Sequence, residues 1–257
     1  MPKLMRIEVG LSSFELFFGF NGNRARAVNL SPWVDKHRRA PHIAHTHVMP
    51  SRTIVVTGFG PFAGHEERNA SWEAVRLLPN SLVHGGREYA LKKLQVPVTY
   101  EAVDAVVPRV WEESPALVVH CGVHGNISTI NLEQCSYSSG YCRPDFANKC
   151  LPCDKVALRS VSAGEEEDGG KCVRLDTNLK VESIARELST VRCVHSTEVG
   201  NYLCGYIYLK SLDFSRDRTL FIHVPSVGKP YSSEQTKDAI FQVLGRCLDQ
   251  LDSEGKL

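Results

Sequence analysis

The stretch Thr53-Ile-Val-Val-Thr-Gly-Phe-Gly60 indicates the fold class, because it has the pattern of a buried strand that ends at a glycine turn. A short run of apolar and β-branched residues bounded by glycine is typical of a strand covered on both faces. A helix is predicted next, over residues 69–78, with Asn69 as its N-cap. A buried strand followed by a helix predicts the first unit of an α/β fold.

The same alternation continues toward the C-terminus. Further strands are predicted at residues 91–96, 115–121, 128–132, 192–195 and 219–223, and further helices at residues 100–111, 176–188 (capped by Asp176) and 232–251. This order predicts a three-layer α/β/α architecture with a mostly parallel central sheet that helices cover on both faces. We therefore expect a single domain over residues 51–257, preceded by an N-terminal extension.

Residues 1–50 differ from the rest of the chain, since they contain a basic stretch with proline and several histidines and no periodicity. Glu8, Glu15 and Asp35 argue against a transit peptide, which is poor in acidic residues. The histidines do not have the spacing of a known metal site. A poorly ordered extension is predicted here.

Residues 142–172 also lack periodicity and are predicted to form an irregular excursion or lid. They contain an acidic run and four cysteines: Cys142, Cys150, Cys153 and Cys172. A zinc knuckle built on Cys150-x-x-Cys153 is the alternative to loop cysteines. The irregular outer spacings and the absence of a turn glycine inside the pair argue against it, so no metal is expected.

Composition narrows the class of protein. The chain has 257 residues, of which 42% are hydrophobic, and a formal net charge of +1. These values suit a globular domain and argue against a nucleic-acid or membrane partner. No run reaches the roughly 18 apolar residues of a membrane span. Nine cysteines without a convincing signal peptide indicate reduced thiols, no structural disulfide and a cytosolic location.

The segment Val199-Gly-Asn-Tyr-Leu-Cys-Gly-Tyr206 places Cys204 just inside the start of a run with helical spacing, predicted to be an amphipathic helix. The N–H groups and dipole of a helix N-terminus stabilise a thiolate. Farther along, Phe221-Ile-His-Val-Pro225 predicts a strand that ends near His223. A cysteine at a helix start and an imidazole at a strand end are an arrangement suited to acyl transfer.

Two glycine-containing turns follow predicted strands. Gly58-Phe-Gly-Pro-Phe-Ala63 matches the dinucleotide pattern, but Pro61 lacks an N–H donor, the helix begins too late, and no acidic residue ends the second strand. The motif therefore predicts two phenyl rings, Phe59 and Phe62, at the edge of the sheet where ligands bind, with packing as their alternative role. The second turn, residues 122–125, offers N–H groups that suit an oxyanion.

Six segments together resemble the pyroglutamyl-peptidase I family over residues 52–248. They are Thr57-Gly-Phe-Gly-Pro-Phe-Ala-Gly64, Asn69-Ala-Ser-Trp72, Leu132-Glu-Gln-Cys135, Gly200-Asn-Tyr-Leu-Cys204, Phe221-Ile-His-Val-Pro225 and Gly228-Lys-Pro-Tyr231. The resemblance implies a cysteine peptidase that removes an N-terminal pyroglutamyl residue from peptides through a thioester acyl-enzyme. It implies no metal and no cofactor.

The resemblance also implies roles for individual residues. Cys204 corresponds to the nucleophile, His223 to the base and Glu133 to the carboxylate that orients the imidazole. Taken by itself, Glu133 has the pattern of an ordinary solvated glutamate. The implied substrate-binding residues are Phe59 and Phe62 around the pyroglutamyl ring, Asn69 beside it, Val123 in the oxyanion region, and Tyr202 and Leu203 in the pocket wall.

The chain departs from the family pattern at three positions. Val199 stands where alanine is usual, Gly205 where asparagine or aspartate is usual, and Ser138 where asparagine is usual. Val199 adds bulk beside the nucleophile, and a glycine loosens a helix start by up to about 1 kcal/mol. Replacing Val199 by alanine together with Gly205 by asparagine is therefore expected to raise the catalytic rate or to tighten the helix start.

Two other classes of function stay open at the level of sequence. The departures favour a weak or silent paralogue that keeps the fold and binds peptide ends or a protein partner. A nucleotide- or nucleoside-using enzyme with a similar sheet is the other alternative, but it requires a phosphate-binding group that the sequence does not offer. The oligomeric state is left open by the sequence.

Overall fold

The computed structural model describes residues 51–62, 68–159 and 172–257. The predicted N-terminal extension with its histidines, and residues 160–171 of the predicted excursion, lie outside the described residues.

The described strands form a seven-stranded central sheet in the order β2-β3-β1-β4-β9-β5-β8. Their bounds are Ser51–Phe59 (β1), Ser81–His84 (β2), Arg87–Val96 (β3), Pro115–Val123 (β4), Ile130–Glu133 (β5), Cys193–Ser196 (β8) and Thr219–Val224 (β9). Strands β3, β1, β4 and β9 are mutually parallel, whereas β5 is antiparallel to β9 and β2 is antiparallel to β3. The prediction of a mostly parallel sheet is confirmed.

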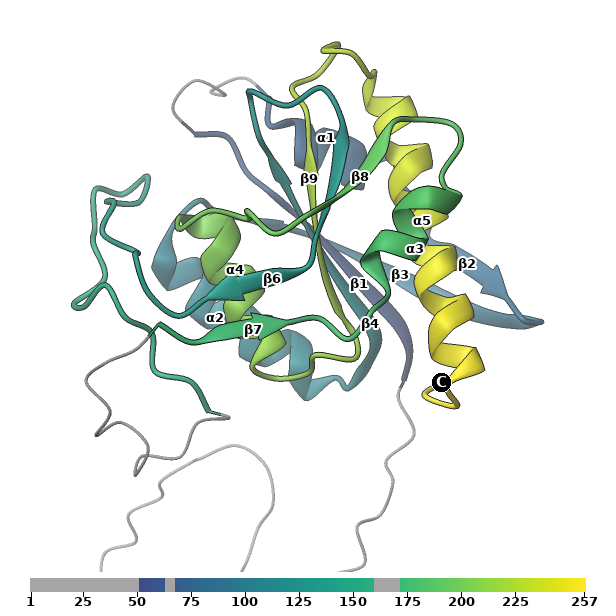
Figure 1. Ribbon diagram of the computed structural model, residues 1–257, viewed down its shortest axis with the longest axis horizontal. Coiled ribbons are helices and arrows are strands. Elements are labelled where there is room, and N and C mark those ends of the chain that lie inside the picture. The colour runs from purple at the N-terminus through teal and green to yellow at the C-terminus, as the bar shows by residue number, and fades with distance from the viewer. Residues whose placement is uncertain (1–50, 63–67, 160–171) are drawn as a thin grey trace, which may run out of the picture. The chain divides into compact units, whose positions relative to one another are not determined.

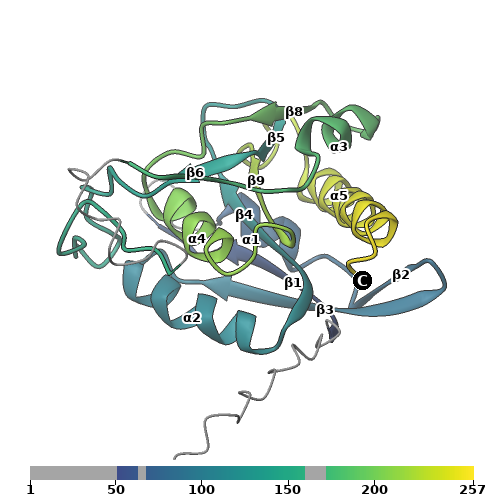
Figure 2. The same cartoon turned by 60° about the horizontal axis from the view of Figure 1, so that its bottom comes forward.

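Helices cover both faces of this sheet, as Figures 1 and 2 show. The helices are α1 (Ala70–Val75), α2 (Tyr100–Glu112), α3 (Val181–Glu187), α4 (Leu203–Leu212) and α5 (Ser233–Ser253). Alternate residues of β1 face opposite layers: Ile54 and Val56 pack in the core shared with α1, α3 and α5, whereas Val55 packs with Val110 of α2. The three-layer α/β/α prediction is therefore confirmed.

Helix α4 is buried on nearly all sides, so the prediction of an amphipathic helix is wrong. Its residues pack against α2, against the central sheet and against a small sheet of two strands, β6 (Cys135–Tyr137) and β7 (Arg174–Asp176). In Figure 2, α4 lies between α2 and β6. Covered from several directions, the helix needs no polar face.

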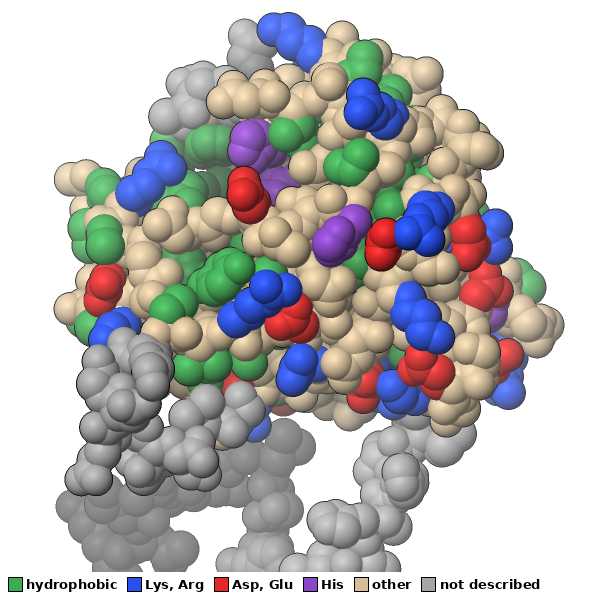
Figure 3. All heavy atoms as spheres, viewed as in Figure 1, with side chains coloured by type: hydrophobic (Ala, Val, Ile, Leu, Met, Phe, Trp, Pro, Cys, Tyr) green, Lys and Arg blue, Asp and Glu red, His purple; other side chains and the backbone are tan. Residues whose placement is uncertain are grey.

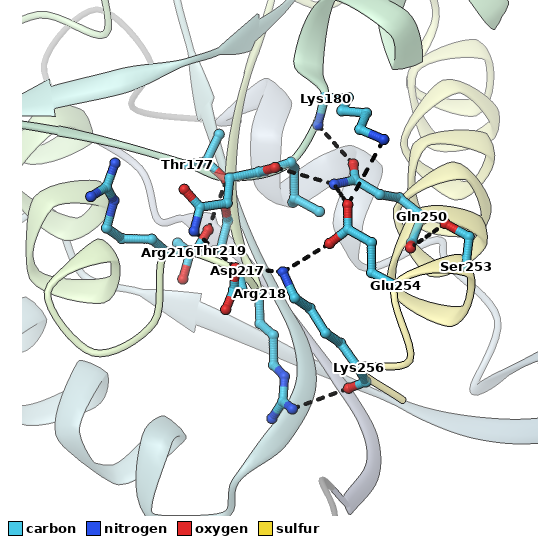
Figure 4. Close-up of polar contacts among 12 residues, drawn as sticks. Thr177, Lys180, Arg216, Asp217, Arg218, Thr219, Gln250, Ser253, Glu254 and Lys256 are labelled. Carbon is cyan, nitrogen blue, oxygen red and sulfur yellow. Dashed lines mark hydrogen bonds and ion pairs between the residues drawn. The ribbon is translucent and has the colours of Figure 1, made fainter.

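The predicted helix over residues 176–188 starts later than expected. Asp176 ends β7 and its carboxylate accepts hydrogen bonds from Arg174, so it caps no helix. Helix α3 begins at Val181, and its N-cap residue Lys180 makes no capping bond with its own side chain. The side chain of Gln250 in α5 replaces that cap, because its Oε1 accepts from the Lys180 N–H at 2.7 Å (Figure 4).

The same C-terminal region is tied to β9. Lys256 forms ion pairs with Asp217 and Glu254, both at 2.8 Å, and Arg218 donates to the Lys256 carbonyl at 3.1 Å, as Figure 4 shows. These contacts hold the end of α5 at the amino-terminal end of the parallel strands, opposite the edge where β1, β4 and β9 end.

Other boundaries differ in detail. The Asn69 cap of α1 is confirmed, since its side chain accepts from the Ser71 N–H, but the helix ends at Val75. The short strands β2, β6 and β7 were not predicted. Residues 142–159 contain neither helix nor strand, as expected for an irregular excursion.

None of the described helices has the length and apolar character needed to span a membrane.

Candidate active site

The carboxyl ends of three adjacent parallel strands meet at one edge of the sheet. Strand β1 ends at Phe59, β4 at Val123 and β9 at Val224, and β4 lies between the other two. Helix α4 begins beside this edge, and Cys204 is its second residue. The predicted position of the cysteine at a helix start is confirmed.

The sulfur of Cys204 lies against the backbone of β4 because residue 122 is a glycine. A Cβ at Gly122 would lie 2.7 Å from the Cys204 Sγ and 2.8 Å from the ring of Phe221, too close for either. Gly122 is the register partner of His223 on β9. The thiol therefore sits beside the imidazole, close enough for the Cys204 sulfur to influence the pKa of His223.

Glu133 lies on the other side of the same imidazole. The Nδ1 of His223 donates to Glu133 Oε1 at 2.8 Å, and both side chains are almost fully buried. The antiparallel pairing of β5 with β9 brings them together, because Glu133 is the register partner of Phe221. The second carboxylate oxygen of Glu133, Oε2, is buried and has no hydrogen-bond partner among the described residues.

Opposing influences act on the pKa of His223. Burial, the largest of them, lowers the pKa, because it disfavours the charged imidazolium. The Cys204 thiolate raises it through its charge and its hydrogen bond, and Glu133 does the same. Their sum outweighs burial, so that the pKa of His223 is raised from 6.5 to about 9. The geometry thus favours an imidazolium between two anions.

Asn69 and Ser71 hold the aromatic loop after β1. The Asn69 Nδ2 donates to the Gly60 carbonyl at 2.9 Å, and its Oδ1 accepts from the backbone N–H and the hydroxyl of Ser71. The Ser71 Oγ in turn accepts from the Phe59 N–H at 3.0 Å. The Asn69 side chain therefore supports the loop that carries Phe59, although it also lines the pocket.

A cavity of about 260 Å³ opens at this edge of the sheet. Its lining includes all six predicted substrate-binding residues together with Cys204 and His223, while Glu133 lies behind His223. Figure 3 shows a hollow in the upper part of one face, bordered by hydrophobic side chains and by histidine. Among the described lining residues, the sequence did not predict substrate-binding roles for Val98, His124, Arg143, Val199, Gly200 and Asn201.

Arg143 had no signal in the sequence, because it lies in the aperiodic stretch. Its guanidinium lies 4.6 Å from the centroid of the Tyr202 ring, and its carbonyl accepts from the Tyr100 hydroxyl at 3.0 Å. The nearby Asp145 is buried and accepts from the Tyr100 N–H at 3.0 Å, which anchors this loop at the start of α2.

The N–H groups around Val123 are only partly available. The His124 N–H donates to the Val224 carbonyl at 2.9 Å and is used in the sheet. The N-cap residue of α4, Tyr202, makes no side-chain capping bond, and the Cys204 N–H has no hydrogen-bond partner among the described residues, so it is available to a substrate oxygen.

The three departures from the family pattern have different structural settings. Val199 is buried and lines the pocket. Ser138 lies outside the pocket lining, where its Oγ accepts from the Val173 N–H at 2.8 Å. A Cβ at Gly205 would lie 2.0 Å from the Gly200 carbonyl oxygen, so asparagine cannot tighten this helix start. The expectation that Gly205→Asn tightens the helix start is therefore wrong.

All nine cysteines are free. Burial raises the pKa of the Cys121 and Cys247 thiols, which makes them poor nucleophiles, whereas Cys204 is half-buried and lines the pocket. No group of metal-ligating side chains lies together within the described ranges.

An α/β sheet that carries a thiol, an imidazole and a carboxylate in a row at its carboxyl edge defines the class of cysteine hydrolases. Comparison with known proteins identifies the family within that class. The family described as "Putative pyroglutamyl peptidase PgaPase_1" matches residues 36–228. This match begins before residue 52, where the sequence resemblance was placed.

Pyroglutamyl-peptidase 1 of Homo sapiens is 36% identical over 214 residues, which cover 81% of this chain and 96% of the human protein. A pyrrolidone-carboxylate peptidase of Finegoldia magna is 27% identical and covers 76% of this chain and 91% of its own length. The structure of pyrrolidone carboxyl peptidase from Thermococcus litoralis has the same fold, with a TM-score of 0.66, 22% identity and coverage of 79% and 96% of the two chains. The chain belongs to the pyroglutamyl peptidase family.

Proposed function

We propose that this protein removes an N-terminal pyroglutamyl residue from peptides, with Cys204 as nucleophile, His223 as acid and base, and Glu133 as the orienting carboxylate. The observation that carries the proposal is that Glu133 is hydrogen-bonded to His223, and that the Cys204 sulfur lies beside the same imidazole at the wall of a pocket lined by two phenyl rings. Family membership supports the same reaction.

The reaction starts from the thiolate of Cys204, whose proton is held by His223. The thiolate attacks the carbonyl carbon that joins pyroglutamate to the next residue, and the C–N bond then breaks as His223 gives its proton to the leaving amine. Water then attacks the thioester, and the neutral imidazole takes its proton. Pyroglutamate leaves, and the thiolate–imidazolium pair returns.

Two features of the fold assist this chemistry. The uncapped N–H groups at the start of α4 stabilise the oxyanion that forms on the attacked carbonyl. The hydrogen bond from His223 Nδ1 to Glu133 leaves the other ring nitrogen facing the sulfur and stabilises the imidazolium.

Selectivity follows from the apolar slot made by Phe59 and Phe62. Pyroglutamate presents a neutral lactam, whereas other amino termini present an ammonium group that loses its hydration in such a slot at a large cost. Peptides that begin with glutamate or glutamine are therefore poor substrates. The side chains in the site supply every proton transfer, so the proposed reaction uses no metal and no cofactor. The free cysteines support a location in the reducing cytosol.

The test measures release of a fluorogenic amine from its pyroglutamyl derivative in the presence of reductant. We expect turnover by the wild type and none by Cys204→Ala or Cys204→Ser with folding intact, while Cys142→Ser, which changes an exposed cysteine outside the pocket lining, keeps full activity. A wild type that is well folded and inert would support the silent-paralogue alternative. Near-full activity of Cys204→Ala would mean that another group is the nucleophile.

A further inference from the structure

The order of the strands defines the direction in which the substrate lies across the site. Phe59 ends β1, the Cys204 sulfur rests on Gly122 of β4, and His223 belongs to β9, on the far side of β4 from β1. With the pyroglutamyl ring beside Phe59, the leaving amine must face His223 to receive its proton. The residue that follows pyroglutamate therefore lies on the β9 side of the pocket.

His124 occupies that side of the pocket. It is exposed, lines the cavity and follows directly after β4, where its N–H bond to the Val224 carbonyl fixes its backbone beside β9. Its ring meets the ring of His223 edge to face, with 5.5 Å between the centroids and 81° between the planes. The imidazole is therefore next to the group that protonates the leaving amine, and it has an N–H donor in either protonation state.

The surroundings of His124 favour a negative partner. The loops after β4 and β9, residues 124–129 and 225–231, contain His124 and Lys229 and no carboxylate. Among the described residues that line the cavity none is acidic. The lining on the side of the pocket that receives the leaving residue thus offers the His124 donor and no carboxylate.

We infer that His124 is a specificity-determining residue that makes this site prefer pyroglutamyl peptides whose second residue is aspartate or glutamate. This inference rests on the proposed function, since it names the class of peptide that the same site takes. The carboxylate of the second residue accepts a hydrogen bond from the His124 ring, and no step of the reaction passes through His124.

The experiment compares kcat/KM for three peptides that differ at one position: pyroglutamyl-glutamyl-, pyroglutamyl-glutaminyl- and pyroglutamyl-lysyl-phenylalanine amide. Glutamate and glutamine have nearly the same shape, so their ratio isolates the effect of charge. Because an N–H bonds a charged carboxylate more strongly than a neutral amide oxygen, by up to about 1 kcal/mol, we expect the wild type to prefer glutamate over glutamine by about two- to fivefold. Added salt should weaken the preference.

Three variants separate the role of His124 from a general effect. His124→Gln should bring the ratio of kcat/KM for the glutamyl peptide to that for the glutaminyl peptide close to one. His124→Glu should make the glutamyl peptide the poorest substrate and the lysyl peptide the best, because like charges repel. The matched control is His195→Gln, which removes an exposed imidazole of β8 outside the pocket lining and should keep the wild-type ratio.

The outcomes distinguish this inference from the proposed function. Equal rates on the glutamyl and glutaminyl peptides in the wild type, or an unchanged ratio in His124→Gln, would overturn the role of His124 while pyroglutamyl release stands. Equal losses on all three peptides in His124→Gln would also overturn it, since they would indicate a contact with the peptide backbone. If no peptide is cleaved, the proposed function itself fails and the inference fails with it.

Discussion

Glu133 contacts His223 through only one of its two carboxylate oxygens, and the other is buried without a partner in the described part of the chain. A half-satisfied buried carboxylate is unfavourable for folding, because its charge has lost its hydration. The same charge raises the pKa of His223 and keeps the imidazolium next to the sulfur. The arrangement thus gives up stability at one side chain in exchange for a charged pair at the reacting atoms.

Glu133→Gln should keep the hydrogen bond to His223 but lose the negative charge. We expect kcat to fall by about 100-fold or more, because the imidazolium is no longer stabilised. In the wild type, kcat/KM should decline above about pH 9, where His223 loses the proton that the leaving amine needs. Glu133 raises this pKa, so its removal lowers the pKa and moves the alkaline limb to lower pH.

The measurement is kcat/KM between pH 5 and pH 10 for the wild type, Glu133→Gln and the control Glu182→Gln, which changes an exposed side chain of α3. An alkaline limb in Glu133→Gln at the wild-type position would contradict the orienting role of Glu133.

The start of α4 depends on a close approach between two backbone segments. Gly200 has a positive φ of 76°, and its carbonyl oxygen points toward Gly205 in the first turn of the helix. No residue with a side chain fits at position 205 without moving the turn that carries the pocket residues 199–202. A helix start that looks loosened by glycine in the sequence is therefore closely packed.

Gly205→Ala should destabilise the protein by about 1–3 kcal/mol, the usual cost of forcing extra atoms into a packed site, and should lower activity by shifting Cys204. Gly245→Ala is the matched control, because Gly245 lies inside α5 with open space around its Cβ position. That change should stabilise the protein by about 0.5–1 kcal/mol. Urea unfolding measures the free energy of unfolding of both variants. Equal free energies for the two would contradict the close approach at Gly205.

A fully buried histidine links three elements of the molecule. His120 of β4 is hydrogen-bonded through Nδ1 to the Thr57 hydroxyl of β1 at 2.8 Å and through Nε2 to the Ser211 hydroxyl of α4 at 2.7 Å. Burial lowers the pKa of His120 from 6.5 to about 3. The folded protein therefore keeps this imidazole neutral at pH values where the unfolded chain binds a proton.

The stability of the molecule should consequently fall as the pH drops below about 6.5, because protonation of His120 favours the unfolded state down to about pH 3. At about 1.4 kcal/mol per pH unit, His120 should account for a loss of about 2 kcal/mol between pH 7 and pH 5. The raised pKa of His223 acts in the opposite direction over this range, so urea unfolding at both pH values measures the part due to His120 as the difference between the wild type and His120→Gln, with His195→Gln as the control. A His120→Gln variant with the same loss as the wild type would exclude His120 as its source.

The boundary of the catalytic domain is a separate proposal about the whole chain. Strand β1 starts at Ser51, and the described residues that line the pocket all come after Ser51 in the sequence. Deletion of residues 1–50 should therefore leave the fold and the rate of pyroglutamyl release unchanged. Activity and circular dichroism of the shortened protein test this, and loss of folding would place part of the extension within the domain.

The order of the helices and of six strands of the central sheet, the α/β class and the positions of Cys204 and His223 could be predicted from the residues themselves. Their signals are local: a buried β-branched run ended by glycine, a cysteine at the start of a helical repeat, a histidine before proline. Each of these signals depends on neighbours within a turn or a strand, so a few consecutive residues are enough to recognise it.

The partners of those residues were decided by tertiary structure. Glu133 had the pattern of a solvated glutamate until the antiparallel pairing of β5 with β9 placed it 2.8 Å from His223, 90 residues away. In the same way, Gln250 caps α3 across 70 residues, and the loop of Arg143 closes over Tyr202. Such contacts depend on which strands are neighbours and in which direction they run, and no local pattern of residues contains that information.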